Sequence, residues 1–97
     1  MKLVITYTTT DGYTYSNDHI LPIEYESPEA LLLAFDEAIQ TYQTDPSKAF
    51  FQIGAHHFEA WDFREYRETR DSFAVSSVEH TLPNIYTLEE WFEKYSK

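Results

Sequence analysis

The sequence predicts a small α+β domain of two layers, with two helices packed on a mainly antiparallel sheet. Runs of β-branched and aromatic residues between turn residues are typical of short strands. Two further segments carry helix-start signals and an apolar stripe at helical spacing. Eight Tyr, seven Phe and two Trp argue against a disordered acidic chain, although the net charge is −10. We expect one domain, residues 1–97, in the order strand–strand–strand–helix–strand–strand–strand–helix.

The N-terminal residues predict a β-hairpin. Residues 3–10 are rich in Val, Ile, Thr and Tyr, and Asp11-Gly12 follows them. This dipeptide tolerates the positive φ angles of a two-residue type I′ turn. Residues 13–16 would then return as the second strand, and the register would place Leu3 opposite Ile20.

Signals for an edge strand and a helix follow the hairpin. Residues 19–25 read as extended, and Pro22 places them on a sheet edge or at a bend. Ser27-Pro28-Glu29 combines an N-cap, a proline at the first helical position and an acid in the first turn. The helix should run over residues 28–42 and end at Thr44-Asp45-Pro46. Its apolar stripe consists of Leu31, Phe35, Ala38, Ile39 and Tyr42.

The middle of the chain predicts several short strands. Residues 49–53 predict one strand, residues 54–57 a turn, and residues 58–63 a strand that pairs back. Without the turn, residues 50–63 would form one strand, which is long against the usual length of about 3–10 residues, so the turn is preferred. The charge-laced residues 64–71 fit either a strand or a helical turn. Residues 72–78 are a further strand.

The last helix has a complete N-terminal signature. Thr87 and Glu90 form a capping box, and Tyr86 with Trp91 forms a hydrophobic staple. One face of this helix carries Leu88, Trp91, Phe92 and Tyr95, while Glu89, Glu90 and Glu93 lie off it.

A long basic-free stretch dominates the charge pattern. Residues 3–47 contain no Lys or Arg but hold eight acids: Asp11, Asp18, Glu24, Glu26, Glu29, Asp36, Glu37 and Asp45. A solvated acidic surface, for solubility or high salt, is one interpretation. The other is a surface that docks on a basic groove as nucleic acid does, with electrostatic steering and aromatic anchors.

Composition excludes several classes of function. With no cysteine, the chain forms neither disulfides nor thiolate metal sites, which favours a reducing compartment. No apolar run is long enough for a signal sequence or a membrane span. The surplus of acid repels phosphate and anionic lipid. We therefore expect a cytoplasmic protein that binds neither nucleic acid directly nor membranes.

The sequence offers little that resembles catalytic machinery. It has no Gly-rich phosphate loop and no nucleophile elbow. His56-His57 with Glu59 and Asp62 has the residue types of a metal site, but adjacent residues of a strand point to opposite faces. We expect no enzyme activity, no metal and no cofactor.

These observations predict a non-enzymatic module that binds a basic protein surface, most simply that of a nuclease or another nucleic-acid-binding protein. In size, acidity and two-layer character the chain resembles the small inhibitors of phages and mobile elements. That group includes anti-restriction and anti-CRISPR proteins, several of which mimic DNA. The candidate partner-binding residues are Glu29, Asp36, Glu37, Glu89, Glu90, Glu93, Asp11 and Asp18.

Two rival hypotheses belong to other classes. A structural or assembly subunit, of a virion or a homo-oligomer, would use exposed aromatic residues and sheet edges instead of charge. A metal-dependent enzyme or sensor would use His56 and His57. The sequence leaves the oligomeric state open.

Overall fold

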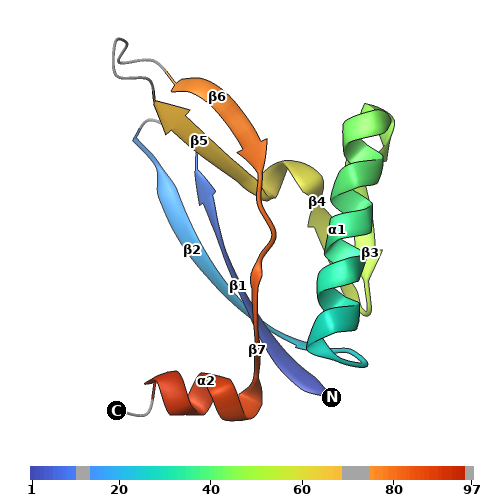
Figure 1. Cartoon of the computed structure of the whole chain (residues 1–97), viewed down its shortest axis with the longest axis vertical. Helices are drawn as coiled ribbons and strands as arrows, with labels where there is room; N and C mark the ends of the chain where they lie inside the picture. The colour runs from blue at the N-terminus through green and yellow to red at the C-terminus, as the bar shows by residue number, and fades with distance from the viewer. Residues whose placement is uncertain (11–13, 69–74, 96–97) are drawn as a thin grey trace.

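A computed structural model describes residues 1–10, 14–68 and 75–95 (Figure 1). Within these ranges the strands are β1 (Lys2–Thr10), β2 (Ser16–Glu24), β3 (Phe50–Ile53), β4 (His56–Glu59), β5 (Arg64–Glu68), β6 (Val75–His80) and β7 (Asn84–Thr87). The α-helices are α1 (Pro28–Thr44) and α2 (Leu88–Tyr95), and Pro46–Lys48 and Ala60–Asp62 are short 3-10 turns.

The predicted α+β class, with two helices and antiparallel sheet, is confirmed. The described strands form a three-stranded sheet in the order β2-β1-β7 and two hairpins, β3-β4 and β5-β6, and all of these pairings are antiparallel. The element order differs from the expected one in three places. A single strand, β2, stands where the second and third strands were predicted. Strand β5 forms in the segment 64–71, for which the sequence also allowed a helical turn, and β7 was not predicted.

The predicted register of the first hairpin is wrong. Thr10 lies opposite Ser16 and Leu3 opposite Ile23, so the connection is longer than a two-residue loop. The predicted turn dipeptide Asp11-Gly12 lies outside the described residues. Burial explains the observed register, because Leu3 and Ile23 are 1% and 4% exposed whereas Ile20 is 60% exposed. The register that puts two apolar side chains into the core prevails over the turn signal.

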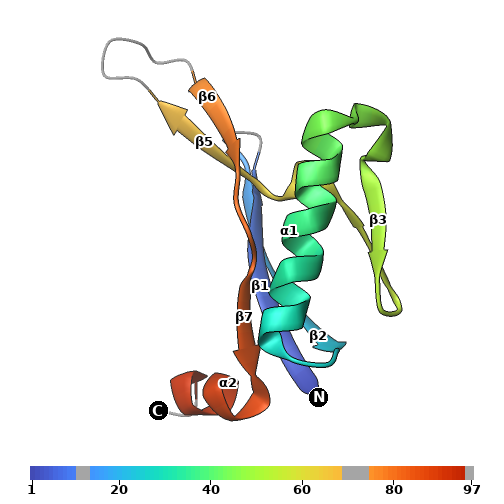
Figure 2. The same cartoon turned by 45° about the vertical axis from the view of Figure 1, so that its right-hand side comes forward.

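The two helices lie on opposite sides of the three-stranded sheet, which Figure 2 shows nearly edge-on. Leu3 and Ile5 of β1 belong to the core together with Leu31 and Phe35 of α1. Val4 points to the other face and is also buried, and α2 contacts β1 and β7 on that side. The core that holds α1 is therefore on one face of the sheet.

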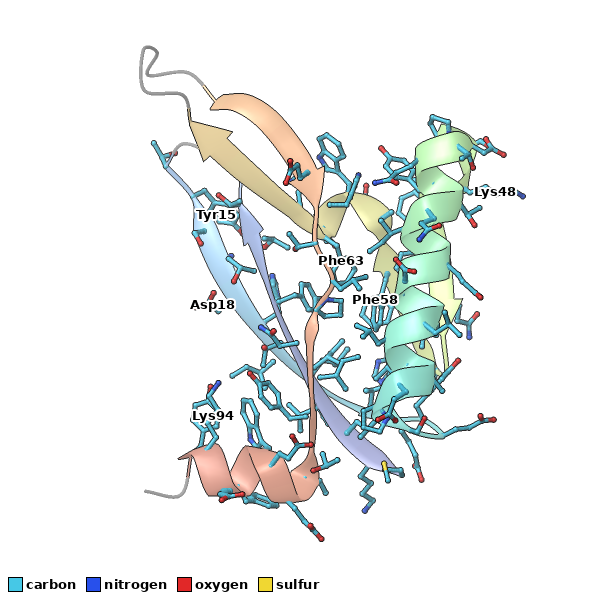
Figure 3. All side chains as sticks on the ribbon, in the orientation of Figure 1. Tyr15, Asp18, Lys48, Phe58, Phe63 and Lys94 are labelled. Atoms are coloured by element: carbon cyan, nitrogen blue, oxygen red, sulfur yellow. The ribbon has the colours of Figure 1, made fainter. Side chains whose placement is uncertain are left out.

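A cluster of aromatic rings joins α1 to the hairpin β3-β4 and to the start of β5. The ring centroid of Phe35 lies 5.9 Å from that of Phe51, 5.0 Å from that of Phe58 and 5.2 Å from that of Phe63. All three pairs meet edge to face, a favourable geometry for aromatic rings. Figure 3 shows Phe58 and Phe63 between α1 and the sheet. Tyr7 completes the cluster, and its burial raises the pKa of its hydroxyl.

Helix α1 begins and ends close to the predicted positions. The hydroxyl of Ser27 accepts a hydrogen bond from the Ala30 N–H at 3.1 Å, which confirms the N-cap. The helix ends at Thr44, and the Asp45 N–H closes the last turn onto the Thr41 carbonyl at 2.8 Å. The Asp45 carboxylate then accepts bonds from the backbone and hydroxyl of Ser47, which lower its pKa.

The middle strands are shorter than predicted. The turn between β3 and β4 is Gly54-Ala55 alone, with Gly54 at a φ of 60°, where a residue without Cβ is favoured. Strand β4 ends at Glu59, and Ala60–Asp62 forms a 3-10 turn in place of further strand. Residues 64–68 form a strand, not a helical turn, and β6 extends to His80. The beginning of the predicted strand 72–78 lies outside the described residues.

The predicted start of α2 is confirmed. The Thr87 hydroxyl accepts from the Glu90 N–H and the Glu90 carboxylate accepts from the Thr87 N–H, both at 3.1 Å. The rings of Tyr86 and Trp91 lie 5.6 Å apart, as expected for a staple. The apolar face is only partly covered, since Phe92 remains 62% exposed.

The molecule is flat and open for its length. Its extents are 44 × 38 × 18 Å and its radius of gyration is 14.9 Å, against about 12.5 Å for a typical domain of this size. Its accessible surface is 6827 Å², whereas a monomer of this mass typically exposes about 5,800 Å². None of the helices in the described residues is long and apolar enough to cross a membrane.

We predict that Phe35→Ala lowers the free energy of unfolding by about 3–5 kcal/mol, because it removes a fully buried ring that three others contact. The matched control is Phe50→Ala, at a phenylalanine that is 77% exposed. It should change stability by less than about 0.5 kcal/mol. Urea denaturation measures both, and similar losses for the two variants would contradict this account of the core.

Candidate interaction surface

Helix α1 presents an acidic face opposite its buried stripe. Leu31, Phe35 and Ile39 of α1 are buried, whereas Glu29 and Glu37 are exposed. Within the part of the chain that the structure describes, the side-chain carboxylates of these two glutamates have no hydrogen bond or ion pair. The third predicted acid, Asp36, is half-buried and accepts a hydrogen bond from the Gln40 amide at 3.0 Å. Glu29 and Glu37 are therefore the carboxylates of α1 that are open to a partner.

An exposed leucine lies between these two glutamates. Leu33 is four residues from Glu29 and four from Glu37, so the three side chains share one face of the helix. Its side chain is 56% exposed although it is large and apolar. Leu33 is not among the residues predicted from the sequence. The consecutive leucines 31–33 were an available signal, because neighbouring residues of a helix point about 100° apart and cannot all face one core. We call Glu29, Leu33 and Glu37 the α1 face.

Helix α2 presents a similar combination on a smaller scale. Glu89, Glu90 and Glu93 are exposed, as predicted for the wet side of the helix. Glu90 has a structural role, since it closes the capping box. The carboxylates of Glu89 and Glu93 are exposed, and Phe92, whose ring is also exposed, is three residues from Glu89 and so lies beside it on the helix surface.

The structure does not gather the eight candidate acids into one patch. Figures 1 and 2 show α1 and α2 at separate places on opposite sides of the three-stranded sheet. Asp18 lies on β2, where its carboxylate accepts a hydrogen bond from the Thr8 hydroxyl at 2.7 Å. Asp11 lies outside the described residues. The acidic side chains therefore occur on both broad faces, with the α1 face as the array that combines charge and apolar surface.

Two basic side chains, Lys94 and Arg64, lie near the face of the three-stranded sheet that carries α2, away from the α1 face. Lys94 of α2 donates to the Tyr86 hydroxyl at 3.0 Å, and this bond raises the pKa of the ammonium group. The guanidinium of Arg64 lies 4.0 Å from the ring centroid of Trp61 and donates to the Thr10 carbonyl at 3.1 Å. Both cations line a hollow of about 570 Å³ that also includes Asp18 and Ile20 of β2 and residues of β1 and β7.

The histidines are dispersed. His56 and His57 are adjacent on β4, where one is half-buried and the other exposed, so they point to opposite faces. His19 stacks on Tyr7 with ring centroids 4.8 Å apart, and a ring nitrogen of His80 lies 2.9 Å from the Phe63 carbonyl. Among the described residues, no three His, Asp or Glu side chains come together as a metal site. The structure thus adds no third ligand to the His56-His57 pair.

Comparison of the sequence with known protein families and with curated proteins found no match, and comparison of the fold with solved structures found none either. The class that the structure defines is an acidic α+β protein with two exposed acidic helix surfaces. Its function has to be argued from these surfaces alone.

We predict that Thr87→Ala destabilises α2, because it removes the hydroxyl that accepts the Glu90 N–H. Loss of an N-cap side chain typically costs about 1 kcal/mol. The observable is a loss of helical ¹³Cα shifts and faster amide exchange within residues 88–95. Glu89→Ala is the control, since Glu89 caps nothing in the described structure and its loss should leave α2 intact. Equal fraying in both variants would show that the cap is not what holds the helix start.

Proposed function

We propose that this protein is a non-enzymatic binding module that acts in the cytoplasm by occupying a basic, nucleic-acid-binding surface of another protein. The observation that carries the proposal is the α1 face, where Leu33 lies exposed between the exposed Glu29 and Glu37. A phage or mobile-element inhibitor of a nuclease, acting as a partial DNA mimic, is the role that fits such a surface best.

The charges on the α1 face support docking on a cationic groove. Residues four apart on a helix place their Cβ atoms about 5–6 Å from each other, so successive turns carry successive charges. Duplex DNA offers about one charge per 1.7 Å, and the helix is a coarser array of the same sign. Residues 3–47 contain no Lys or Arg, so no basic residue of this segment neutralises the array. Long-range attraction would then speed encounter with a basic partner.

The apolar side chain of Leu33 would supply binding affinity that the charges alone do not. Exposed ion pairs contribute little net affinity, because desolvation and side-chain ordering offset their attraction. A large apolar residue that fills a pocket on the partner is a more effective anchor. Leu33 is in the centre of the acidic array, so binding would surround it with the charged pairs and exclude water from it.

Affinity capture from a host extract tests the proposal directly. The bound protein should be a basic nucleic-acid-binding protein, should wash off at high salt, and should be displaced by a short DNA duplex. A captured protein that neither salt nor duplex DNA displaces would contradict the DNA-mimic role.

Charge reversal at the α1 face should slow association with that partner. We predict that the double variant Glu29→Lys/Glu37→Lys lowers the association rate constant by roughly tenfold at low salt and flattens its salt dependence. The matched control is Glu89→Lys/Glu93→Lys, which makes the same change of charge on α2. Stopped-flow kinetics measures both, and equal slowing would show that net charge matters and not the α1 face.

Removal of the Leu33 side chain should speed dissociation from the partner instead of slowing association. We predict that Leu33→Ala raises the dissociation rate constant by roughly tenfold and leaves the association rate nearly unchanged. Because Leu33 is 56% exposed, the same variant should unfold at nearly the wild-type urea concentration. Surface plasmon resonance gives the two rates. An unchanged dissociation rate would remove Leu33 from the interface.

An assembly role is the second candidate, and the open shape favours it. The accessible surface of 6827 Å² exceeds that of a typical monomer by about 1,000 Å², and an interface usually covers about 800 Å² on each partner. Phe50 and Phe92 are 77% and 62% exposed. Sedimentation at low concentration distinguishes the two roles, since a defined oligomer supports assembly and a monomer supports the inhibitor.

A further inference from the structure

Strand β2 leaves one side of its backbone unpaired. It is the outermost strand of the sheet order β2-β1-β7. The Tyr25 N–H donates to the Met1 carbonyl at 3.0 Å, and Met1 and Tyr25 continue the register of β1 and β2. In an antiparallel pair, hydrogen-bonded positions alternate with non-bonded ones. Odd-numbered residues of β2 therefore bond to β1, and even-numbered residues direct their N–H and C=O groups to the free edge.

The position of Pro22 is consistent with this alternation of bonded and non-bonded residues. It lies opposite Val4 at an even position, where its missing N–H removes no bond to β1. The outward groups that remain are the N–H groups of Ser16, Asp18 and Ile20 and the carbonyls of Ser16, Asp18, Ile20 and Pro22. Within the described part of the chain, none of these groups has a hydrogen bond. At the other end of the strand, the turn residue Gly54 approaches the Glu24 carbonyl, so the open part of the edge is residues 16–22.

The side chains on this edge specify what it would accept. Asp18 and Ile20 share one face of β2, and both are exposed, Ile20 to 60%. The Thr8 hydroxyl holds the Asp18 carboxylate on that face. An incoming strand would therefore meet a carboxylate and an aliphatic side chain two residues apart.

We propose that residues 16–22 of β2 form a strand-addition site for an extended segment of a basic partner, with Lys or Arg beside Asp18 and an apolar residue opposite Ile20. Main-chain hydrogen bonds would give affinity and the alternating side chains would give specificity. The identity of the partner as a basic protein rests on the proposed function, but the site is separate from the α1 face. Charge argues against a second copy as the occupant, because each copy carries −10 and the contact would be a short strip.

Amide hydrogen exchange of the free protein tests the edge itself. The amides of Asp18 and Ile20 should exchange at least tenfold faster than those of His19 and Leu21, which bond to β1. Protection of all four amides in a monomer would overturn the assignment of the edge. The same protection in a sedimenting dimer would show that a second copy occupies it, which also overturns the proposal.

A peptide titration tests the occupant. The probe is acetyl-(Lys-Thr-Val-Thr)2-amide, which places Lys and Val two residues apart on one face of an extended strand. Its control is the same peptide with N-methylated amides, which keeps the charge but cannot donate main-chain hydrogen bonds. At saturation the exchange of the Asp18 and Ile20 amides should slow at least tenfold. N-methylation of the peptide should weaken its binding at least tenfold, and so should Asp18→Lys in the protein, whose exposed side chain makes that variant compatible with folding.

The outcomes separate this site from the α1 face. If the peptide shifts the amides of α1 and leaves those of β2 unprotected, the strand-addition site is wrong and the proposed function stands. If Glu29→Lys/Glu37→Lys abolishes partner capture but leaves peptide binding at β2, both are supported. Equal binding of the N-methylated peptide, or no binding of either peptide, would overturn strand addition.

Discussion

The contacts of the Phe35 ring hold this fold together, because within the described residues no continuous sheet joins the three antiparallel pieces. One ring of α1 meets Phe51 and Phe58 of the hairpin β3-β4 and Phe63 at the start of β5. Leu31 and Ile39 extend the same buried stripe along the helix. The described core residues pack on α1 from this side, and Glu29, Leu33 and Glu37 on its opposite side are exposed. The exposed α1 face is a direct consequence of the one-sided core.

The flat shape has the same origin. The core lies on one face of the three-stranded sheet and the short helix α2 lies on the other (Figure 2). In the described part of the chain, this arrangement leaves exposed side chains on both broad surfaces. On such surfaces a carboxylate stays hydrated and lowers the stability of the fold little. An exposed Leu33 or Phe92, in contrast, leaves apolar surface in water and forgoes the free energy of burial. This combination of exposed charge and uncovered apolar side chains is the basis of the docking surface that we propose.

Local sequence signals predicted both helices well, whereas the pairing and register of the strands were predicted poorly. Ser27 caps α1, and Thr87 and Glu90 cap α2, since a cap is decided within about four residues. The register of β1 and β2 was wrong because burial of Ile23, not the turn dipeptide, sets it. Strand β7 was missed because its pairing with β1 joins residues that are about eighty positions apart.

The sequence by itself determined the α+β class, the acidic character and the residue types of the candidate surface, because composition and short-range periodicity encode them. Only the tertiary structure decided which acids are available. It assigned Glu90 to a cap and Asp36 to a bond with Gln40, placed the two helices on opposite sides, and left Leu33 and the outer edge of β2 exposed. These outcomes depend on which faces are buried against residues distant in the chain, and local sequence does not specify that.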